Sequence, residues 1–144
     1  CQPEQVAITS GTQEGLDLAA RLFLNPGDRV CMEDPGYPGA ALVFEAVGAR
    51  ISTATVDDEG MKPSQAGLRG ARLVYVTPAH QFPLGIALAQ RRRAELLRFA
   101  QRHLKDDYDG ELSFDAQLPP LYGADGADRV VHVGTFSKVP APSI

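Results

Sequence analysis

Short runs of β-forming residues alternate with helical repeats along this chain, and that alternation limits its fold more than any other feature. Strands are predicted at residues 6–9, 29–33, 50–56, 72–77 and 129–133. Helices are predicted at residues 12–24 and 88–103, where apolar side chains recur at intervals of three and four. A further helix, with Gly48 as its C-cap, carries on one face Ala40, Val43, Phe44 and Val47. The pattern predicts an α/β fold, in which helices flank a mainly parallel sheet.

The polar segments between these elements are predicted to be turns, connections or solvent-facing surface. Residues 25–28 (NPGD) form a turn, and residues 57–67 (DDEGMKPSQAG) form a polar connection. The QRRR run at residues 90–93 is predicted to lie on the solvated face of its helix, because charged runs usually do.

The composition is that of an ordinary globular protein, with 44% hydrophobic and 22% charged residues. A chain of 144 residues suffices for one domain. The net charge of −4 provides no basic face for nucleic acid, and no apolar run is long enough to span a bilayer. Cys1 and Cys31 lack the spacing of a zinc site or a disulfide framework, and no signal peptide is recognisable, so a cytoplasmic location is expected. Because the first residue is not methionine, we expect a piece of a longer protein.

The first polar cluster is TSGTQEG, residues 9–15, where a predicted strand leads into a helix. Ligands of parallel sheets bind beyond the carboxyl ends of the strands. The backbone N–H groups and hydroxyls around Gly11, Thr12 and Gln13 would lie at the positive end of a helix, which suits a phosphate. The alternative is an ordinary N-cap by Ser10 or Thr12.

Two further clusters follow strands. In DPGYPG, residues 34–39, Tyr37 is free to stack on a flat ligand ring, or else it half covers the core. In TPAHQFP, residues 77–83, His80 and Gln81 stand between two prolines, and the alternative is a stiff polar loop.

The last two clusters are DDYDGE, residues 106–111, and GTFSK, residues 134–138. DDYDGE lacks the ligand pattern of a calcium loop, and no metal site is predicted anywhere in the chain. Taken in order, the clusters provide a phosphate seat, a stacking aromatic ring, a polar loop, an aspartate with a nearby tyrosine, and a lysine. These are the parts that hold pyridoxal phosphate, whose ring acts as an electron sink.

The longest motif behind this interpretation is PEQVAITSGTQEGLDLAARLFLNPGDRVCMEDPGYPGA, residues 3–40, and the others are TPAHQFPLG, DDYDGEL and GTFSK. On these motifs the chain resembles the large domain of class I/II (fold type I) pyridoxal-phosphate-dependent aminotransferases. It is most similar to the aminotransferase-like domain of MocR/GabR-type transcriptional regulators of the GntR family.

The resemblance implies a role for each matching position. Lys138 would be the catalytic, Schiff-base lysine, Asp106 would pair with the pyridine nitrogen, and Tyr108 would lie by the phenolic oxygen of the cofactor. The remaining cofactor-binding residues would be Gly11, Thr12, Gln13 and Thr135 at the phosphate with Ser137 close by, Tyr37 on the ring, and His80 and Gln81 in the lining loop.

Two of the departures from the family pattern bear on the predicted site residues. Ordinary aminotransferases place an asparagine where Phe82 stands. Relatives carry a buried strand between the helix that ends near His103 and the aspartate, whereas here only Leu104 and Lys105 remain. Asp106 is therefore expected to be misplaced, unless the helix unwinds to replace the strand.

Residues 1–144 are thus expected to be an incomplete large domain, without the upstream winged-helix domain and the downstream small domain. As the sensing core of a regulator, the domain would bind an amino acid or amine, form a homodimer in the intact protein, and reach DNA only through the missing domain. No membrane contact is expected. The alternatives are an active aminotransferase, in which Lys138 also moves protons, and a fragment that binds no cofactor.

Overall fold

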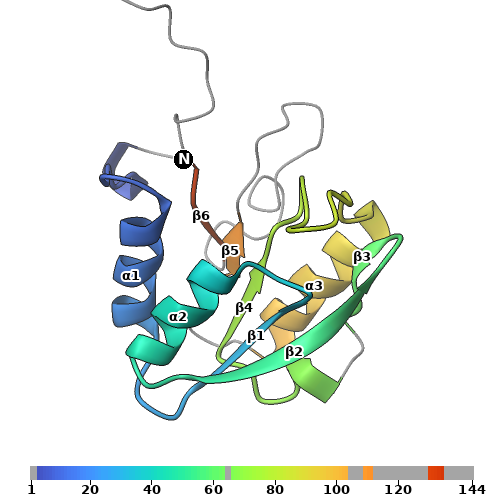
Figure 1. Cartoon of the computed structure of the whole chain (residues 1–144), viewed down its shortest axis with the longest axis horizontal. Coiled ribbons are helices and arrows are strands. Elements are labelled where there is room, and N and C mark those ends of the chain that lie inside the picture. The colour runs from blue at the N-terminus through green and yellow to red at the C-terminus, as the bar shows by residue number, and fades with distance from the viewer. Residues whose placement is uncertain (1–2, 64–65, 104–108, 112–129, 135–144) are drawn as a thin grey trace, which may run out of the picture.

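The computed structural model describes residues 3–63, 66–103, 109–111 and 130–134. In this part of the chain, six strands form one sheet in the order β3-β2-β1-β4-β5-β6 (Figure 1). The strands are β1 (Arg29–Asp34), β2 (Arg50–Asp57), β3 (Gly60–Met61), β4 (Leu73–Val76), β5 (Asp109–Glu111) and β6 (Val130–His132). All pairings are parallel except the antiparallel pairing of β3 with β2. The predicted α/β class and mainly parallel sheet are confirmed.

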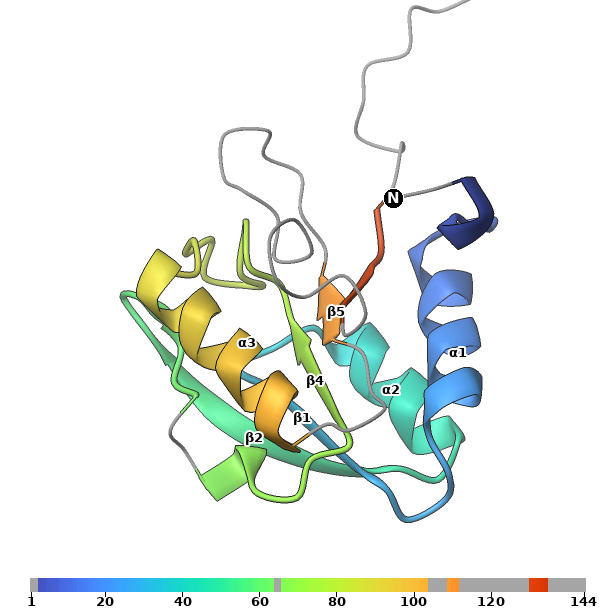
Figure 2. The same cartoon turned by 180° about the vertical axis from the view of Figure 1, so that it is seen from behind.

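Helices cover both faces of the sheet (Figures 1 and 2). The helices are α1 (Thr12–Phe23), α2 (Pro38–Ala46) and α3 (Gln90–His103), with 3-10 turns η1 (Pro3–Gln5) and η2 (Ala66–Leu68). On the α1 and α2 face, Leu16 and Phe44 are buried with Met32 of β1. On the opposite face, Cys31 of β1 is buried in one cluster with Leu96 of α3. Alternate residues of β1 therefore enter different cores, as a strand covered on both faces requires.

Most of the predicted elements are confirmed to within a few residues. The predicted turn forms where the Asp28 N–H donates to the Asn25 carbonyl at 3.0 Å. Gly48 ends the second helix with a φ of 82°, which favours glycine. No described helix is long and apolar enough to cross a membrane.

One predicted strand is wrong, and one predicted connection contains an additional strand. Residues 6–9 form no strand, because none of the described strands pairs with them, and Ile8 is 97% exposed. The predicted polar connection at residues 57–67 contains a short strand that was not predicted, β3. Gly60, with a φ of 94°, makes the tight turn that folds β3 back onto β2.

The QRRR run is also not a solvated face throughout. Arg91 is exposed, but Arg92 and Arg93 are 8% and 2% exposed. The Arg92 guanidinium donates to the Met61 carbonyl and to the Asp57 carboxylate, at 3.1 and 3.0 Å. Arg93 donates to the carbonyls of Leu88 and Pro78, at 3.0 and 3.2 Å. Arginines at the start of α3 therefore hold the neighbouring hairpin and the loop after β4.

The three arginines allow a matched test of this burial. We expect Arg93→Ala to lower the free energy of unfolding by about 2–4 kcal/mol, because buried carbonyls lose a charged donor. Arg91→Ala removes the same side chain from an exposed pair with Glu95 and should cost less than about 1 kcal/mol. Urea unfolding of both variants measures the difference, and equal losses would contradict the burial.

Candidate functional site

The loops after β1 and β4 are tied together at the carboxyl edge of the sheet. Glu33, in β1, lies 4% exposed beside Thr77, the first residue after β4. Its Oε2 accepts hydrogen bonds from the Thr77 N–H at 3.1 Å and from the Thr77 hydroxyl at 2.6 Å. Because β1 and β4 are adjacent and parallel, both loops leave the sheet at one edge, where ligands of such sheets bind.

The start of α1 presents backbone N–H groups without a capping side chain. The N-cap residue is Gly11, and this cap has no side-chain hydrogen bond, so capping by Ser10 or Thr12 is not observed. The first N–H groups of a helix have no acceptor within that helix and favour an anion. Before the helix, the Ser10 N–H donates to the Glu14 carboxylate at 2.5 Å, which lowers the pKa of Glu14. The predicted phosphate residues Gly11, Thr12 and Gln13 therefore occupy a suitable position.

Tyr37 and Gln13 meet above Gly39, although Gln13 lies on a different helix. Gln13 Nε2 lies 3.4 Å from the Gly39 carbonyl oxygen. A Cβ at Gly39 would lie 2.6 Å from the hydroxyl end of the Tyr37 ring and 2.7 Å from Gln13 Nε2. Only a residue without a side chain lets both groups occupy this place. The fold thus brings together the predicted stacking residue and one of the predicted phosphate residues.

The loop after β4 holds its two predicted residues differently. The His80 side chain is exposed, with its ring close to Gly85, whose φ of 73° favours glycine. The Gln81 side chain is buried, and its Nε2 donates to the carbonyls of Pro35 and Phe82 at 2.7 and 2.6 Å. The Gln81 amide therefore links the loop after β4 to the loop after β1.

Phe82 and Tyr37 form an aromatic pair across these two loops. Their ring centroids are 5.6 Å apart, and the ring planes meet at 76°, an edge-to-face arrangement. Phe82 stands at the position where an asparagine is expected only in ordinary aminotransferases, and its side chain remains 45% exposed. The Phe82 position therefore offers an aromatic ring beside Tyr37 and no side-chain hydrogen bond.

The other predicted site residues lie outside the described residues: Asp106, Tyr108, Thr135, Ser137 and Lys138. The neighbouring strands are described. Residues Asp109–Glu111 occupy the position between β4 and β6, with Gly110 aligned to Tyr75 and Glu111 to Val76. The strand in this position therefore follows Asp106 in the sequence, whereas the resemblance implies a strand before this aspartate. The edge of β4 is thus paired by residues that come after Asp106 in the sequence.

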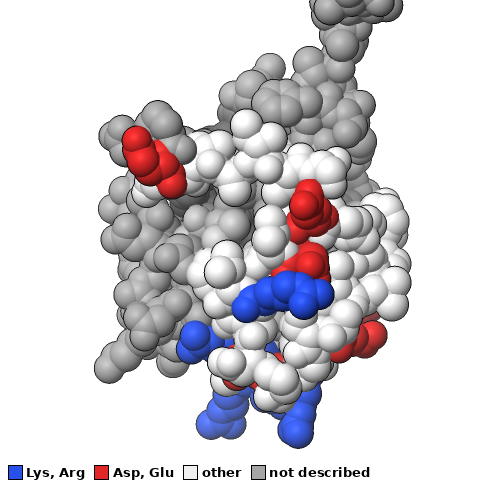
Figure 3. Space-filling model, turned by 90° about the vertical axis from the view of Figure 1, so that its left-hand side faces the viewer, with Lys and Arg blue, Asp and Glu red and all other residues white. Residues whose placement is uncertain are grey.

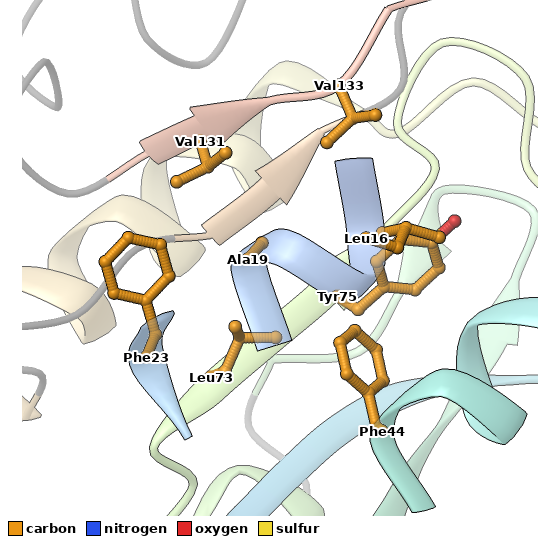
Figure 4. Close-up of a pocket in the computed structure, with 8 residues that line it drawn as sticks. All are labelled: Leu16, Ala19, Phe23, Phe44, Leu73, Tyr75, Val131 and Val133. Atoms are coloured by element: carbon orange, nitrogen blue, oxygen red, sulfur yellow. The ribbon is translucent and has the colours of Figure 1, made fainter. Parts of the chain in front are cut away.

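Among the described residues, no group of three or more histidine, cysteine or acidic side chains could hold a metal ion. A narrow pocket between α1 and the sheet is lined almost entirely by apolar side chains (Figure 4). Its lining residues are Leu16, Ala19, Phe23, Phe44, Leu73, Tyr75, Val131 and Val133. This pocket has almost no polar groups that could bind a charged ligand. The candidate site is therefore placed at the carboxyl edge of the sheet.

Two residues of the site, Glu33 and Gly39, were missed in the sequence. Glu33 ends an apolar strand run, and a charge at such a point could have indicated a buried contact. Burial raises the pKa of Glu33 more than its hydrogen bonds from Thr77 and Gln81 lower it. The Glu33 Oε1 and Tyr75 hydroxyl oxygens are buried and find no hydrogen-bond partner within the described part of the chain.

The helix N-terminus, the aromatic pair and the polar loop all lie at the edge of an α/β sheet where ligands of parallel sheets bind. The family model for aminotransferase class I and II matches residues 1–139. The chain belongs to this family. Because this family model matches nearly the whole chain, it supports the resemblance from which the site residues were predicted.

Curated relatives include both regulators and enzymes. The chain is 43% identical to the HTH-type transcriptional regulator TauR of Rhodobacter capsulatus, over 99% of this chain and 30% of that protein. It is 38% identical to the probable rhizopine catabolism regulatory protein MocR of Rhizobium meliloti, over 100% of this chain and 30% of that protein. It is also 34% identical to aromatic-amino-acid aminotransferase 1 of Thermococcus litoralis, over 95% of this chain and 36% of that enzyme. The chain thus spans only about a third of their length.

Solved structures of aminotransferases share the fold. An archaeal alanine:glyoxylate aminotransferase matches with a TM-score of 0.84 and 32% identity, over 96% of this chain and 38% of that one. LysN of Thermus thermophilus, an α-aminoadipate aminotransferase complexed with N-(5'-phosphopyridoxyl)-L-leucine, matches with a TM-score of 0.82 and 33% identity, over 96% and 39%. The predicted fold type I architecture is confirmed.

Glu33 gives the stability of the domain a pH dependence. A carboxyl group whose pKa is raised on folding binds its proton more tightly in the folded state, so its contribution to stability is lost as pH rises through the folded pKa. We expect the free energy of unfolding to fall with pH above the ordinary value of 4.5 by more in the wild type than in Glu33→Gln. Urea unfolding between pH 4 and 8 measures this, with the exposed Glu45→Gln as control. Parallel curves for wild type and Glu33→Gln would contradict the raised pKa.

Proposed function

We propose that the chain is the cofactor-binding core of a pyridoxal-phosphate-dependent, aminotransferase-like domain. The observation that carries the proposal is the meeting of Tyr37 and Gln13 above Gly39 at the start of α1. A phosphate at the helix N-terminus and an aromatic ring beside it match the two ends of this cofactor. Family membership and the pyridoxyl complex of LysN support the choice of cofactor.

The described residues fit the phosphate and one face of the ring. Gly11, Thr12 and Gln13 would hold the phosphate through backbone and side-chain N–H groups, and Tyr37 would cover the ring. Gln81 would act through the loop that it holds, and His80 stands exposed in that loop. When bound, the cofactor supplies an electron-poor ring that stabilises negative charge on the carbon next to the amino group.

The remaining roles are carried by the resemblance of the sequence. Thr135 and Ser137 would add donors to the phosphate, Asp106 would face the ring nitrogen with Tyr108 near the ring oxygen, and Lys138 would be the attachment residue. Residues 134–138 follow β6 in the sequence, and β6 runs parallel to β5 and β4. Their connection therefore starts at the carboxyl edge that Tyr37 and Gln13 share.

In the whole protein we propose an effector-sensing role of the MocR/GabR type. TauR and MocR, which are similar over nearly the whole chain, are named as regulators. The domain would bind an amino acid or amine, and DNA contact would belong to a winged-helix domain outside residues 1–144. We propose a homodimer from the resemblance to the family. Exposed leucines on α1 and α2 support a protein contact there: Leu18, Leu22 and Leu42 are 42%, 74% and 67% exposed. The described surface on that side has broad uncharged areas, with acidic and basic side chains at its centre and basic ones at its lower edge (Figure 3).

An active aminotransferase is the second candidate, favoured by the similarity to the Thermococcus enzyme. A chain that binds no cofactor is the third. It is favoured by the strand position of Asp109–Glu111, because Asp106 then precedes the strand that in relatives aims it at the ring. Release of a 2-oxo acid from an amino acid by the loaded protein would distinguish the enzyme from the sensor.

The direct test of the cofactor is its attachment to Lys138. We expect pyridoxal phosphate to give a visible absorbance band, which borohydride reduction converts into a covalent mark on one peptide. Lys138→Ala should lose both the band and the mark, and Lys62→Ala should keep them, because Lys62 pairs with Asp57 at the β2–β3 hairpin. A band that survives Lys138→Ala would sink the assignment of this lysine.

Gly39→Ala tests the shared place of Tyr37 and Gln13. The new Cβ would displace the ends of both side chains, so cofactor affinity should fall roughly three- to tenfold while stability changes little. Fluorescence titration with pyridoxal phosphate measures the affinity. In a Tyr37→Ala, Gln13→Ala background the same change should have no further effect, because residues that share a contact are not additive. An additive loss there would contradict the proposed mechanism.

A further inference from the structure

Glu33 is a buried acidic residue that has no role in the function proposed above. It is 4% exposed, and only its Oε2 is hydrogen bonded within the described residues, by Thr77 and, more distantly, by Gln81 at 3.5 Å. For a buried carboxylate with one oxygen that has no hydrogen-bond partner, the free-energy cost of desolvation exceeds the gain from its hydrogen bonds. Stability alone therefore does not explain this residue.

The bond from Glu33 to Thr77 sets the direction of a hydroxyl group. The Thr77 hydroxyl donates to Glu33 at 2.6 Å and accepts from the Phe82 N–H at 3.2 Å. Glu33 Oε2 accepts from both the Thr77 N–H and the Thr77 hydroxyl, so the hydroxyl proton points toward Glu33 and the hydroxyl lone pairs are left to the Phe82 N–H. Hydrogen bonds in such a chain also strengthen one another.

Phe82 is held on both sides of its Cα by this network. Its N–H is bound by Thr77, and its carbonyl accepts from Gln81 Nε2 at 2.6 Å. Gln81 Nε2 also bonds to Pro35, two residues before Tyr37. With the backbone fixed in this way, the exposed Phe82 ring stands edge-on to Tyr37. The chain of contacts runs from Glu33 through Thr77 and Phe82 to Tyr37.

We propose that Glu33 is a positioning residue of the cofactor site, which through Thr77 and Phe82 fixes the angle of the Tyr37 ring. The proposal rests on the function proposed above, since Tyr37 is taken as the ring that covers the cofactor. Glu33 does not touch the ligand. It selects one arrangement of the two loops, which Gln81 and the Tyr37–Phe82 ring pair also join.

The first test needs no cofactor. Amide hydrogen exchange of Phe82, followed by NMR in the ligand-free chain, should quicken at least about fivefold in Glu33→Ala, because its acceptor loses its fixed direction. Glu33→Gln keeps an acceptor oxygen for Thr77 and should restore near-wild-type exchange. Thr77→Val removes the hydroxyl itself and should quicken exchange as Glu33→Ala does, which serves if Glu33→Ala fails to fold. Glu45→Ala, an exposed carboxylate on α2, is the control and should change nothing.

The second test is the affinity for pyridoxal phosphate in the same variants. Affinity should fall several-fold in Glu33→Ala and Thr77→Val and recover in Glu33→Gln. Unchanged Phe82 exchange in both Glu33→Ala and Thr77→Val would overturn the positioning role. Faster exchange with unchanged affinity would also overturn it, because the network would then be structural only. If the wild type binds no pyridoxal phosphate, the proposed function fails, and the exchange data still report on the network.

Discussion

The hydrogen bonds between Glu33 and Thr77 are the contact on which the candidate site depends. They join the ends of two adjacent parallel strands, and each strand leads directly into a loop with predicted site residues. Gln81 then ties these loops to each other through the Pro35 carbonyl. The site is thus built from buried backbone and side-chain contacts, and its ligand-facing groups stand on a supported frame.

Close packing around a glycine completes this frame. Gly39 leaves room for the ends of Tyr37 and Gln13, and Phe82 meets the Tyr37 ring edge-on from the other loop. These contacts join residues that are far apart in the sequence, on α1, before α2 and after β4. The same arrangement would suit the proposed sensor and an enzyme alike, because both would need the cofactor held at a fixed angle before an amino compound binds.

The sequence predicted much of the fold because its elements have strong local signals. Periodic apolar residues predicted α1 and α3, and the turn chemistry around Gly48 predicted the end of α2. Errors arose where a distant partner decides the outcome. Residues 6–9 have strand composition but no described strand beside them, and the arginines at 92 and 93 are charged yet buried by carbonyl partners. At the site, residue types predicted Tyr37 and Gln13, but no local signal shows that Gly39 unites them or that Phe82 meets Tyr37.

The most direct test of the central claim is an NMR titration of the chain with pyridoxal phosphate. The account predicts saturable shifts of the Thr12 and Gln13 amide signals and of the Tyr37 ring signals with one common dissociation constant, since phosphate and ring belong to one ligand. Inorganic phosphate should move the two amides and leave the Tyr37 ring unchanged. Shifts confined to other parts of the chain, or no saturable shift at all, would contradict a cofactor site at this edge of the sheet.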